Sequence, residues 1–350
     1  MKRLFLEALG RFKEAAAQAN ESLGLLSSEE SHALRLVASE VAEGKWDSHF
    51  PSDTLQGFLE LNALFGRIVA NRARSISDLE GSDLVSLSSL NQSSNDVLPT
   101  VVHIASLICL RDRLIPALQA LETTLVLKAD QFRGMFKVGR THLQDDLPIG
   151  FDQVFRGFAG QIQRGGKRLK LVEKELSEVP LGGGVVGTGH GVHKDFALKS
   201  IAYLNRSLEL SLEETDNHFA SQNNIDLLLS ASGATRTVAA ALYKVANDIR
   251  FMGSGPRAGF GELDLPAVQP GSSIMPGKVN PVIAEALLMV VAQVFGNDSA
   301  VLHAIYGSNF EHATFLPVAS RNFLESLVLL ANAVTAFTEK CLSGIQVANQ

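Results

Sequence analysis

One glycine-bounded loop carries side chains that suit chemistry on an anion. It runs from Gly271 to Pro281 and reads GSSIMPGKVNP. Asn280 and Pro281 precede a long apolar stretch, and these residue types are preferred at the N-cap and the first position of a helix. A helix N-terminus with Lys278 beside it can bind a carboxylate, and Ser272 adds a hydroxyl in a loop that can close over a ligand. The same pattern also fits a glycine-rich turn that only caps a helix.

Two other polar strings stand next to predicted helices. QSSND, at residues 92–96, can cap the helix that follows it or hold a carboxylate. GRTHLQD, at residues 139–145, places His142 in a connection between two helices. A lone loop histidine is more often structural than catalytic, so the residues alone leave its role open.

Long helices are expected to position these strings. Apolar residues recur at helical spacing over six segments, at about 101–136, 150–178, 195–210, 217–251, from 281 onward, and 308–342. Pro116 is predicted to kink the first helix, because proline removes a backbone donor and clashes with the preceding turn. Strand-like alternation is almost absent. The pattern predicts an all-α fold, an elongated bundle of long helices.

Composition narrows the class of protein. The chain has 350 residues and a net charge of −6, which argues against nucleic acid as the main partner. Cys109 and Cys341 lack a CxxC or metal spacing, so reduced buried thiols and no metal site are expected. No uninterrupted apolar run reaches the roughly 20 residues that span a bilayer. The N-terminus lacks a signal-peptide core, and a cytoplasmic protein with no membrane partner is expected.

The string GSSIMPGKVNP matches the signature loop of the fumarase/aspartase superfamily, in the form typical of class II fumarate hydratases. The stretches 247–257 and 291–298 resemble the same branch, and the resemblance covers the chain from about Gly24 to Ile345. It implies a small dicarboxylate substrate and no metal or organic cofactor. It also implies a homotetramer with a shared helical core, in which each site combines loops from three subunits.

The resemblance assigns a role to individual residues. Ser272 would be the general base, and Lys278 and Asn280 would hold the reacting carboxylate. His142, supported by Glu285, would serve the leaving-group side or orient water. Further substrate contacts would come from Ser93, Ser94, Asn95, Thr141 and Thr188.

The implied reaction removes a proton beside a carboxylate of a succinyl unit and eliminates the neighbouring group to leave fumarate. A fumarate hydratase-like carbon–oxygen lyase of the tricarboxylic acid cycle, interconverting malate and fumarate, is the first prediction. Some family features are altered: residues 54–69 are largely apolar and keep only Asn62, and Leu316 replaces a lysine. Two alternatives therefore stay open. One is a carbon–nitrogen lyase acting on aspartate or an N-substituted aspartate, and the other is a non-catalytic scaffold derived from a lyase.

The resemblance also predicts the domain organisation. Residues 1–100 are expected to form a shortened N-terminal helical domain. Residues 101–350 are expected to form the central long-helix domain, with the small C-terminal domain of the family absent.

Overall fold

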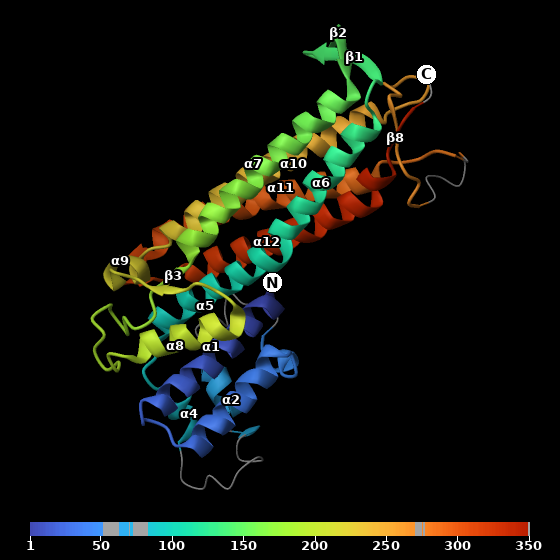
Figure 1. Cartoon of the computed structure of the whole chain (residues 1–350). Coiled ribbons are helices and arrows are strands. Elements are labelled where there is room, and N and C mark those ends of the chain that lie inside the picture. Colours follow the sequence, from blue (N-terminus) through green and yellow to red (C-terminus); the bar gives the residue numbers. More distant parts are fainter. Residues whose placement is uncertain (52–62, 70, 73–82, 270–274, 276, 349–350) are drawn as a thin grey trace. The chain divides into compact units, whose positions relative to one another are not determined.

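The computed structural model describes residues 1–51, 63–69, 71–72, 83–269, 275 and 277–348. The chain forms two compact units, each assembled from segments far apart in the sequence (Figure 1). The first unit comprises Met1–Cys109, Glu173–Ser230 and Ser299–Glu325, and the second comprises Leu110–Val172, Ala231–Asp298 and Ser326–Gln350. These interleaved units are a different kind of division from the predicted boundary after residue 100, which stays a prediction.

The first unit is mainly helical. Helix α1 (Lys2–Ser22) packs along α2 (Ser28–Ala42) and contacts α5 (Ser94–Cys109) and α8 (Phe196–Leu208). Shorter helical segments are η1 (Asp47–His49), residues 63–69, α4 (Leu84–Leu87), α9 (His218–Asn223) and η3 (Ala304–Gly307). Strand β3 (Glu178–Val179) pairs parallel with β4 (Glu213–Glu214), and β6 (Ser308–Asn309) pairs antiparallel with β7 (His312–Ala313).

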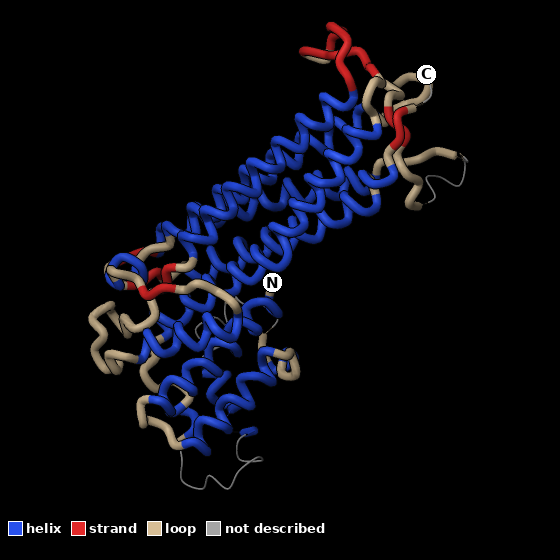
Figure 2. The backbone as a smooth tube through the Cα atoms, viewed as in Figure 1, coloured by secondary structure: helices blue, strands red, loops and turns tan. Residues whose placement is uncertain are grey.

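Four long helices contribute residues to both units: α7 (Phe151–Leu176), α10 (Asp226–Met252), α11 (Val282–His303) and α12 (Leu316–Lys340). Within the second unit α7 lies against α6 (Ile115–Gln131), where Gln163 Nε2 donates to Glu122 Oε1 at 2.9 Å, and Figure 2 shows that helix dominates this unit. The remaining elements are the π-helical turn η2 (Leu110–Leu114), the hairpin β1 (Phe136–Thr141) and β2 (Gln144–Gly150), the pair β5 (Leu263–Asp264) and β8 (Gln346–Val347), and η4 (Leu342–Gly344).

Both aromatic and polar contacts hold the second unit together. The Phe132 ring at the end of α6 lies 5.2 Å from that of Phe155 on α7, in an edge-on arrangement. On α11, the buried Asp298 carboxylate accepts hydrogen bonds from Ser232 Oγ and Arg236 Nη1 on α10, both at 2.7 Å. Satisfying a buried carboxylate this way fixes the register of the two helices.

The all-α class predicted from helical spacing is confirmed. Helix α11 begins at Val282, directly after Pro281. The π-helical turn η2 ends two residues before Pro116, at which a kink is predicted. The segment 139–145 lies between two helices as predicted, and it forms part of a strand hairpin that the near absence of strand-like alternation did not indicate. Two helix predictions are wrong in detail. The helix predicted over 217–251 is broken at Asn224, whose backbone is extended, and the helix predicted over 308–342 begins only at Leu316, after the strand pair β6–β7.

Helices α1 and α2 pack closely because Gly10 has no side chain. A Cβ at this position would lie 2.6 Å from the backbone oxygen of Ala38 and 2.6 Å from the backbone nitrogen of Ala42. Both obstacles are backbone atoms, so the helices themselves would have to separate.

Gly10→Ala is therefore expected to lower the free energy of unfolding by about 1–3 kcal/mol, the usual range for overpacking. Gly157→Ala on α7 is the matched control, since its Cβ would meet nothing within 4 Å. The control should be neutral or more stable by roughly 0.5–1 kcal/mol, because alanine favours helix over glycine. Chemical denaturation of both variants measures the difference, and equal stabilities would contradict the close packing.

Candidate active site

A two-residue turn between β1 and β2 carries His142. Thr141 pairs with Gln144 across the turn, and Thr141 Oγ1 donates to Asp146 Oδ2 at 2.9 Å. His142 and Leu143 have φ angles of 53° and 62°, in the left-handed region. Hairpin turns of this kind normally use asparagine and glycine, because other side chains are strained there. The imidazole is thus held in a strained turn, a feature that clusters at functional sites.

Ionic contacts anchor this hairpin to the loop after α10. Arg140 Nη1 donates to Glu262 Oε1 at 2.6 Å, and Lys137 Nζ lies 3.3 Å from Glu262 Oε2. The Arg140 guanidinium also lies 4.4 Å from the centroid of the Phe260 ring. Glu262 is buried, so its hydrogen bond with Arg140 and its ion pair with Lys137 are poorly screened and hold β1 in place.

The described part of the glycine-bounded loop leads into α11. Lys278 is exposed, and its backbone N–H donates to the backbone oxygen of Met275 at 3.2 Å. Glu285 lies in the first turn of α11, where its N–H donates to the Pro281 oxygen at 3.0 Å. A cation just before a helix N-terminus favours a bound carboxylate. Ser272, the predicted base, lies outside the described residues.

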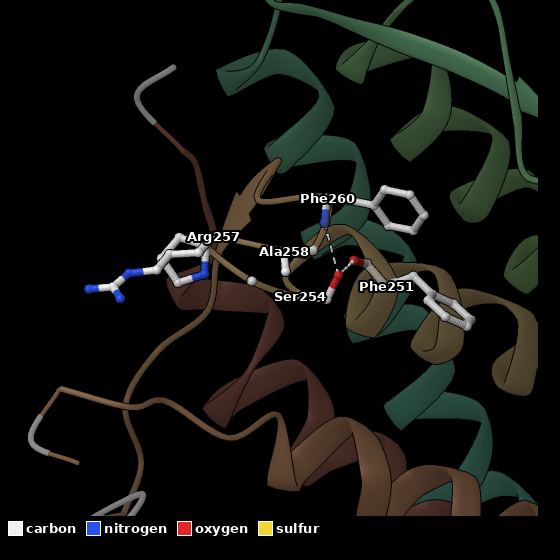
Figure 3. Close-up of a pocket in the computed structure, with 8 residues that line it drawn as sticks. Phe251, Ser254, Arg257, Ala258 and Phe260 are labelled. Atoms are coloured by element: carbon white, nitrogen blue, oxygen red, sulfur yellow. Dashed lines mark hydrogen bonds between the residues drawn. The ribbon is translucent and has the colours of Figure 1, made fainter.

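Two open cavities adjoin the loop after α10. One, of about 1050 Å³, is lined by residues 253–257, 260–261 and 263–265 together with Met275, Gly277, Lys278, Val279 and Ala348. The other, of about 770 Å³, lies beside Phe251 and residues 254–260. Ser254 Oγ donates to the Phe251 backbone oxygen at 2.6 Å and accepts the Phe260 backbone N–H at 3.1 Å (Figure 3). The Arg257 side chain extends away from the Phe251 and Phe260 rings. Lys278 therefore lines the larger cavity, whose other lining residues come mainly from the loop after α10.

In the first unit, QSSND forms the start of α5. The Ser93 N–H donates to Asp96 Oδ1 at 3.0 Å, and the Asn95 N–H donates to Ser93 Oγ at 3.3 Å. This reciprocal pattern is that of a helix cap. Capping accounts for Ser93 and Asp96, whereas the half-buried Ser94 and Asn95 side chains lie at the helix N-terminus, where a carboxylate is favourable.

The Asp96 carboxylate also ties this cap to the glycine-rich segment 181–191. Its Oδ2 accepts the backbone N–H groups of Gly182 at 3.2 Å and Gly184 at 3.0 Å. Burial raises the pKa of Asp96 to about 6, and its backbone donors at Ser93, Gly184 and Gly182 act in the opposite direction. Asp96 is therefore mostly ionised at neutral pH and holds the two segments through its charge.

A second contact joins the same two segments. Asn95 Nδ2 donates to the Val185 oxygen at 2.7 Å, and Thr188 lies exposed three residues further along the glycine-rich segment. Ser94 and Asn95 also line a small cavity of about 20 Å³ with Leu316, which stands where the resemblance predicts a lysine.

The predicted site residues fall into two groups. The first unit brings Ser93, Ser94 and Asn95 to the segment that contains Thr188. The second unit holds Thr141, His142, Lys278, the half-buried Asn280, and Glu285. Within the described part of the chain, no hydrogen bond or ion pair joins His142 to Glu285. Their predicted pairing stays a prediction, and within a single chain it has no direct contact to support it.

Sequence reasoning assigned no role to Asp96, Arg140 or Glu262. Both Asp96 and Arg140 lie inside the motifs QSSND and GRTHLQD. For Asp96 a signal was present, because an acidic residue three positions after a serine is typical of a helix cap. Glu262 had no such signal, because its partner lies 122 positions away in the sequence. Across the described residues, no group of three or more His, Cys, Asp and Glu side chains is placed to hold a metal ion.

Comparisons with known proteins cover most of the chain. The lyase family model matches residues 2–296. The class II fumarate hydratase of Mycobacterium tuberculosis (strain ATCC 25618 / H37Rv) is 42% identical over 349 residues, which are 99% of this chain and 73% of that protein. That of Corynebacterium efficiens is 43% identical over 344 residues, 97% of this chain and 72% of that protein. A crystal structure of recombinant class II fumarase from Schistosoma mansoni matches with a TM-score of 0.94 at 31% identity, covering 99% of this chain and 77% of that one.

The strained turn makes a stability prediction. Replacing either turn residue by glycine, as His142→Gly or Leu143→Gly, should stabilise the protein by about 1 kcal/mol, since each left-handed non-glycine residue costs about that much or more. Thermal unfolding of the two variants checks this. A clear loss of stability in both would contradict the assignment of strain to the turn.

Proposed function

This chain belongs to the lyase family that includes the class II fumarate hydratases, and we propose that it catalyses the reversible hydration of fumarate to malate. It is a fumarate hydratase-like lyase by its 42% identity across nearly the whole chain. We propose in addition that the bond it breaks is a carbon–oxygen bond. The observation that supports it most is the retention of the complete string GSSIMPGKVNP at the entry to α11.

The first chemical step is removal of a proton from the malate carbon next to a carboxylate. Ser272 is proposed as the base, by resemblance. The electron pair moves into that carboxylate, which becomes a doubly charged aci-carboxylate. Lys278 and Asn280, at the N-terminal end of α11, are proposed to hold it, because fixed positive charge and helix amides stabilise developing negative charge better than water does.

In the second step the electron pair of the aci-carboxylate forms the double bond of fumarate, the carbon–oxygen bond breaks, and the hydroxyl group takes up a proton and leaves as water. His142 is proposed to supply this proton on the leaving-group side, or in the reverse direction to orient the attacking water. A carboxylate beside a histidine raises the basicity of the imidazole and fixes its tautomer, and Glu285 is proposed for that role. The other substrate carboxylate is assigned to Ser93, Ser94, Asn95, Thr141 and Thr188.

The enzyme is proposed to be a cytoplasmic homotetramer. In the second unit, α11 exposes Met289 (67%) and Phe295 (41%), apolar side chains that self-association would cover. One described helical run, Val282–Gly307, is long and apolar enough to cross a membrane, and 33% of its apolar 18-residue window is buried. A core helix shared between subunits has the same composition. A shared core is also proposed to bring Glu285 of the partner subunit to His142, since no hydrogen bond or ion pair joins the two residues within the described part of one chain.

One observation favours a second candidate function. Leu316 lines the small cavity beside Ser94 and Asn95 in place of the family lysine. A less polar wall suits a substrate with a larger or less polar leaving group, such as an N-substituted aspartate. The carbon–nitrogen lyase thus remains the runner-up, with the same base and carboxylate residues.

Purified protein should convert fumarate to malate, followed as loss of the ultraviolet absorbance of fumarate. Ser272→Ala and His142→Gly should each lower kcat about 10²- to 10⁴-fold, the usual contribution of an acid–base group. Leu143→Gly is the matched control, because it changes the same turn and leaves the imidazole in place. An inactive wild type with fumarate, but active with an aspartate, would transfer the proposal to the carbon–nitrogen lyase, and inactivity with both would overturn it.

The composite site makes a separate prediction. Ser272→Ala and His142→Gly chains, denatured together and refolded, should regain part of the wild-type activity, since some sites then receive the intact serine loop and the intact hairpin from different subunits. Ser272→Ala mixed with Lys278→Met should regain none, because both changes fall on one loop. Recovery in neither mixture would argue that each site is built from a single chain.

A further inference from the structure

A lysine lies buried inside the first unit. Lys13 on α1 has 3% of its surface exposed. Its Nζ donates to the Ser88 backbone oxygen at 3.0 Å and to Gln92 Oε1 at 2.8 Å, and it lies 5.3 Å from the centroid of the Phe65 ring. A buried ammonium is costly to desolvate, and well-packed apolar residues often serve stability at least as well. Packing alone therefore does not account for a lysine at this position.

The contacts of Lys13 lead directly to the proposed carboxylate-binding loop. Gln92 immediately precedes Ser93, and its Nε2 donates to the Leu90 oxygen at 3.2 Å. Asn20, two helical turns after Lys13 on α1, donates Nδ2 to the same Leu90 oxygen at 3.2 Å. Helix α1 thus binds the segment 88–92, which precedes Ser93, through two side chains, Lys13 and Asn20. Of these two, only Lys13 can carry a charge.

Asp96 is the ionisable group whose charge acts on Lys13. Burial lowers the pKa of Lys13 to about 7, and the Asp96 carboxylate acts in the opposite direction. The other described residues around this small cavity are neutral: Ala17, Asn20, Leu34, Phe65, Leu87, Ser88 and Gln92. Charges interact over longer distances in such surroundings than in water. The Lys13 cation therefore offsets the Asp96 anion, which in turn holds the amides of Ser93, Gly182 and Gly184.

We propose that Lys13 is a positioning residue for substrate binding: its ammonium holds Gln92 and balances Asp96, and so keeps Ser93, Ser94 and Asn95 arranged to receive a carboxylate. The inference rests on the proposed function, because it takes this loop to be part of the dicarboxylate site. Lys13 does not itself touch substrate.

Steady-state kinetics with fumarate and malate test the proposal. Lys13→Met should raise KM roughly tenfold to a hundredfold, the factor expected when a hydrogen bond to a charged group is lost, with a smaller change in kcat. Lys128→Met is the matched control, because Lys128 is also buried and donates to a backbone oxygen, that of Ile345 at 2.8 Å. The control should leave KM unchanged. An unchanged KM in Lys13→Met, or an equal rise in both variants, would overturn the proposal.

The pH dependence separates positioning by charge from packing. In the wild type, KM should rise as the pH is raised through about 7, where Lys13 loses its proton. Lys13→Arg should keep the low KM and lose this rise, because a guanidinium stays charged throughout that range. An arginine variant with the same pH profile as the wild type would count against the charge of Lys13, even if Lys13→Met failed to fold.

Hydrogen exchange provides a readout that needs no turnover. Lys13→Met should increase amide exchange in the segments 92–96 and 182–184, whose N–H groups bond to Asp96 and Ser93. Lys128→Met should leave both segments protected. If the wild type were inactive on fumarate, the proposed function would fail while this comparison still decided the role of Lys13, and unchanged protection in Lys13→Met would refute it.

Discussion

The buried carboxylate of Asp96 is the interaction on which the proposed carboxylate-binding loop QSSND depends. It accepts three backbone N–H groups, from Ser93 on one segment and from Gly182 and Gly184 on another. A carboxylate with no exposed surface must be satisfied by such donors, so the two segments cannot move apart independently. The glycines make this possible, since φ is 104° at Gly182 and 67° at Gly184, where other side chains are strained.

The hairpin that carries His142, in the second unit, follows the same principle on different elements. Another buried carboxylate, Glu262, draws Arg140 and Lys137 against the loop after α10 and steadies the hairpin below its strained turn. Long helices supply the rigid frame, and the residues proposed for the chemistry lie where the helices begin and end. Binding residues on loops held by a rigid scaffold are the usual arrangement in enzymes. In both units, the residues that hold the loops are buried and charged, whereas the residues proposed to meet substrate are short or exposed.

Much of this could be predicted from the sequence, because local patterns encode local structure. Helical spacing gave the all-α class, and the Asn280–Pro281 pair marked the entry to α11 within one residue. The signature string gave the family. The hairpin was missed because its turn is His-Leu, without the glycine or asparagine that signals one. The sequence offers no signal for Lys13 and Glu262, because their partners Gln92 and Arg140 lie 79 and 122 positions away in the chain. The roles of Ser272, His142 and the other site residues stay predictions.

Proton transfer at the carbon next to a carboxylate, with water added across the neighbouring bond, is the chemistry proposed for this lyase. Nuclear magnetic resonance of malate formed from fumarate in deuterium oxide follows that proton. One deuterium per malate is expected, at a single position of the CH₂ carbon, because one base delivers it to one face of the double bond. Label spread over both positions of that carbon, or fumarate left unchanged, would rule this chemistry out.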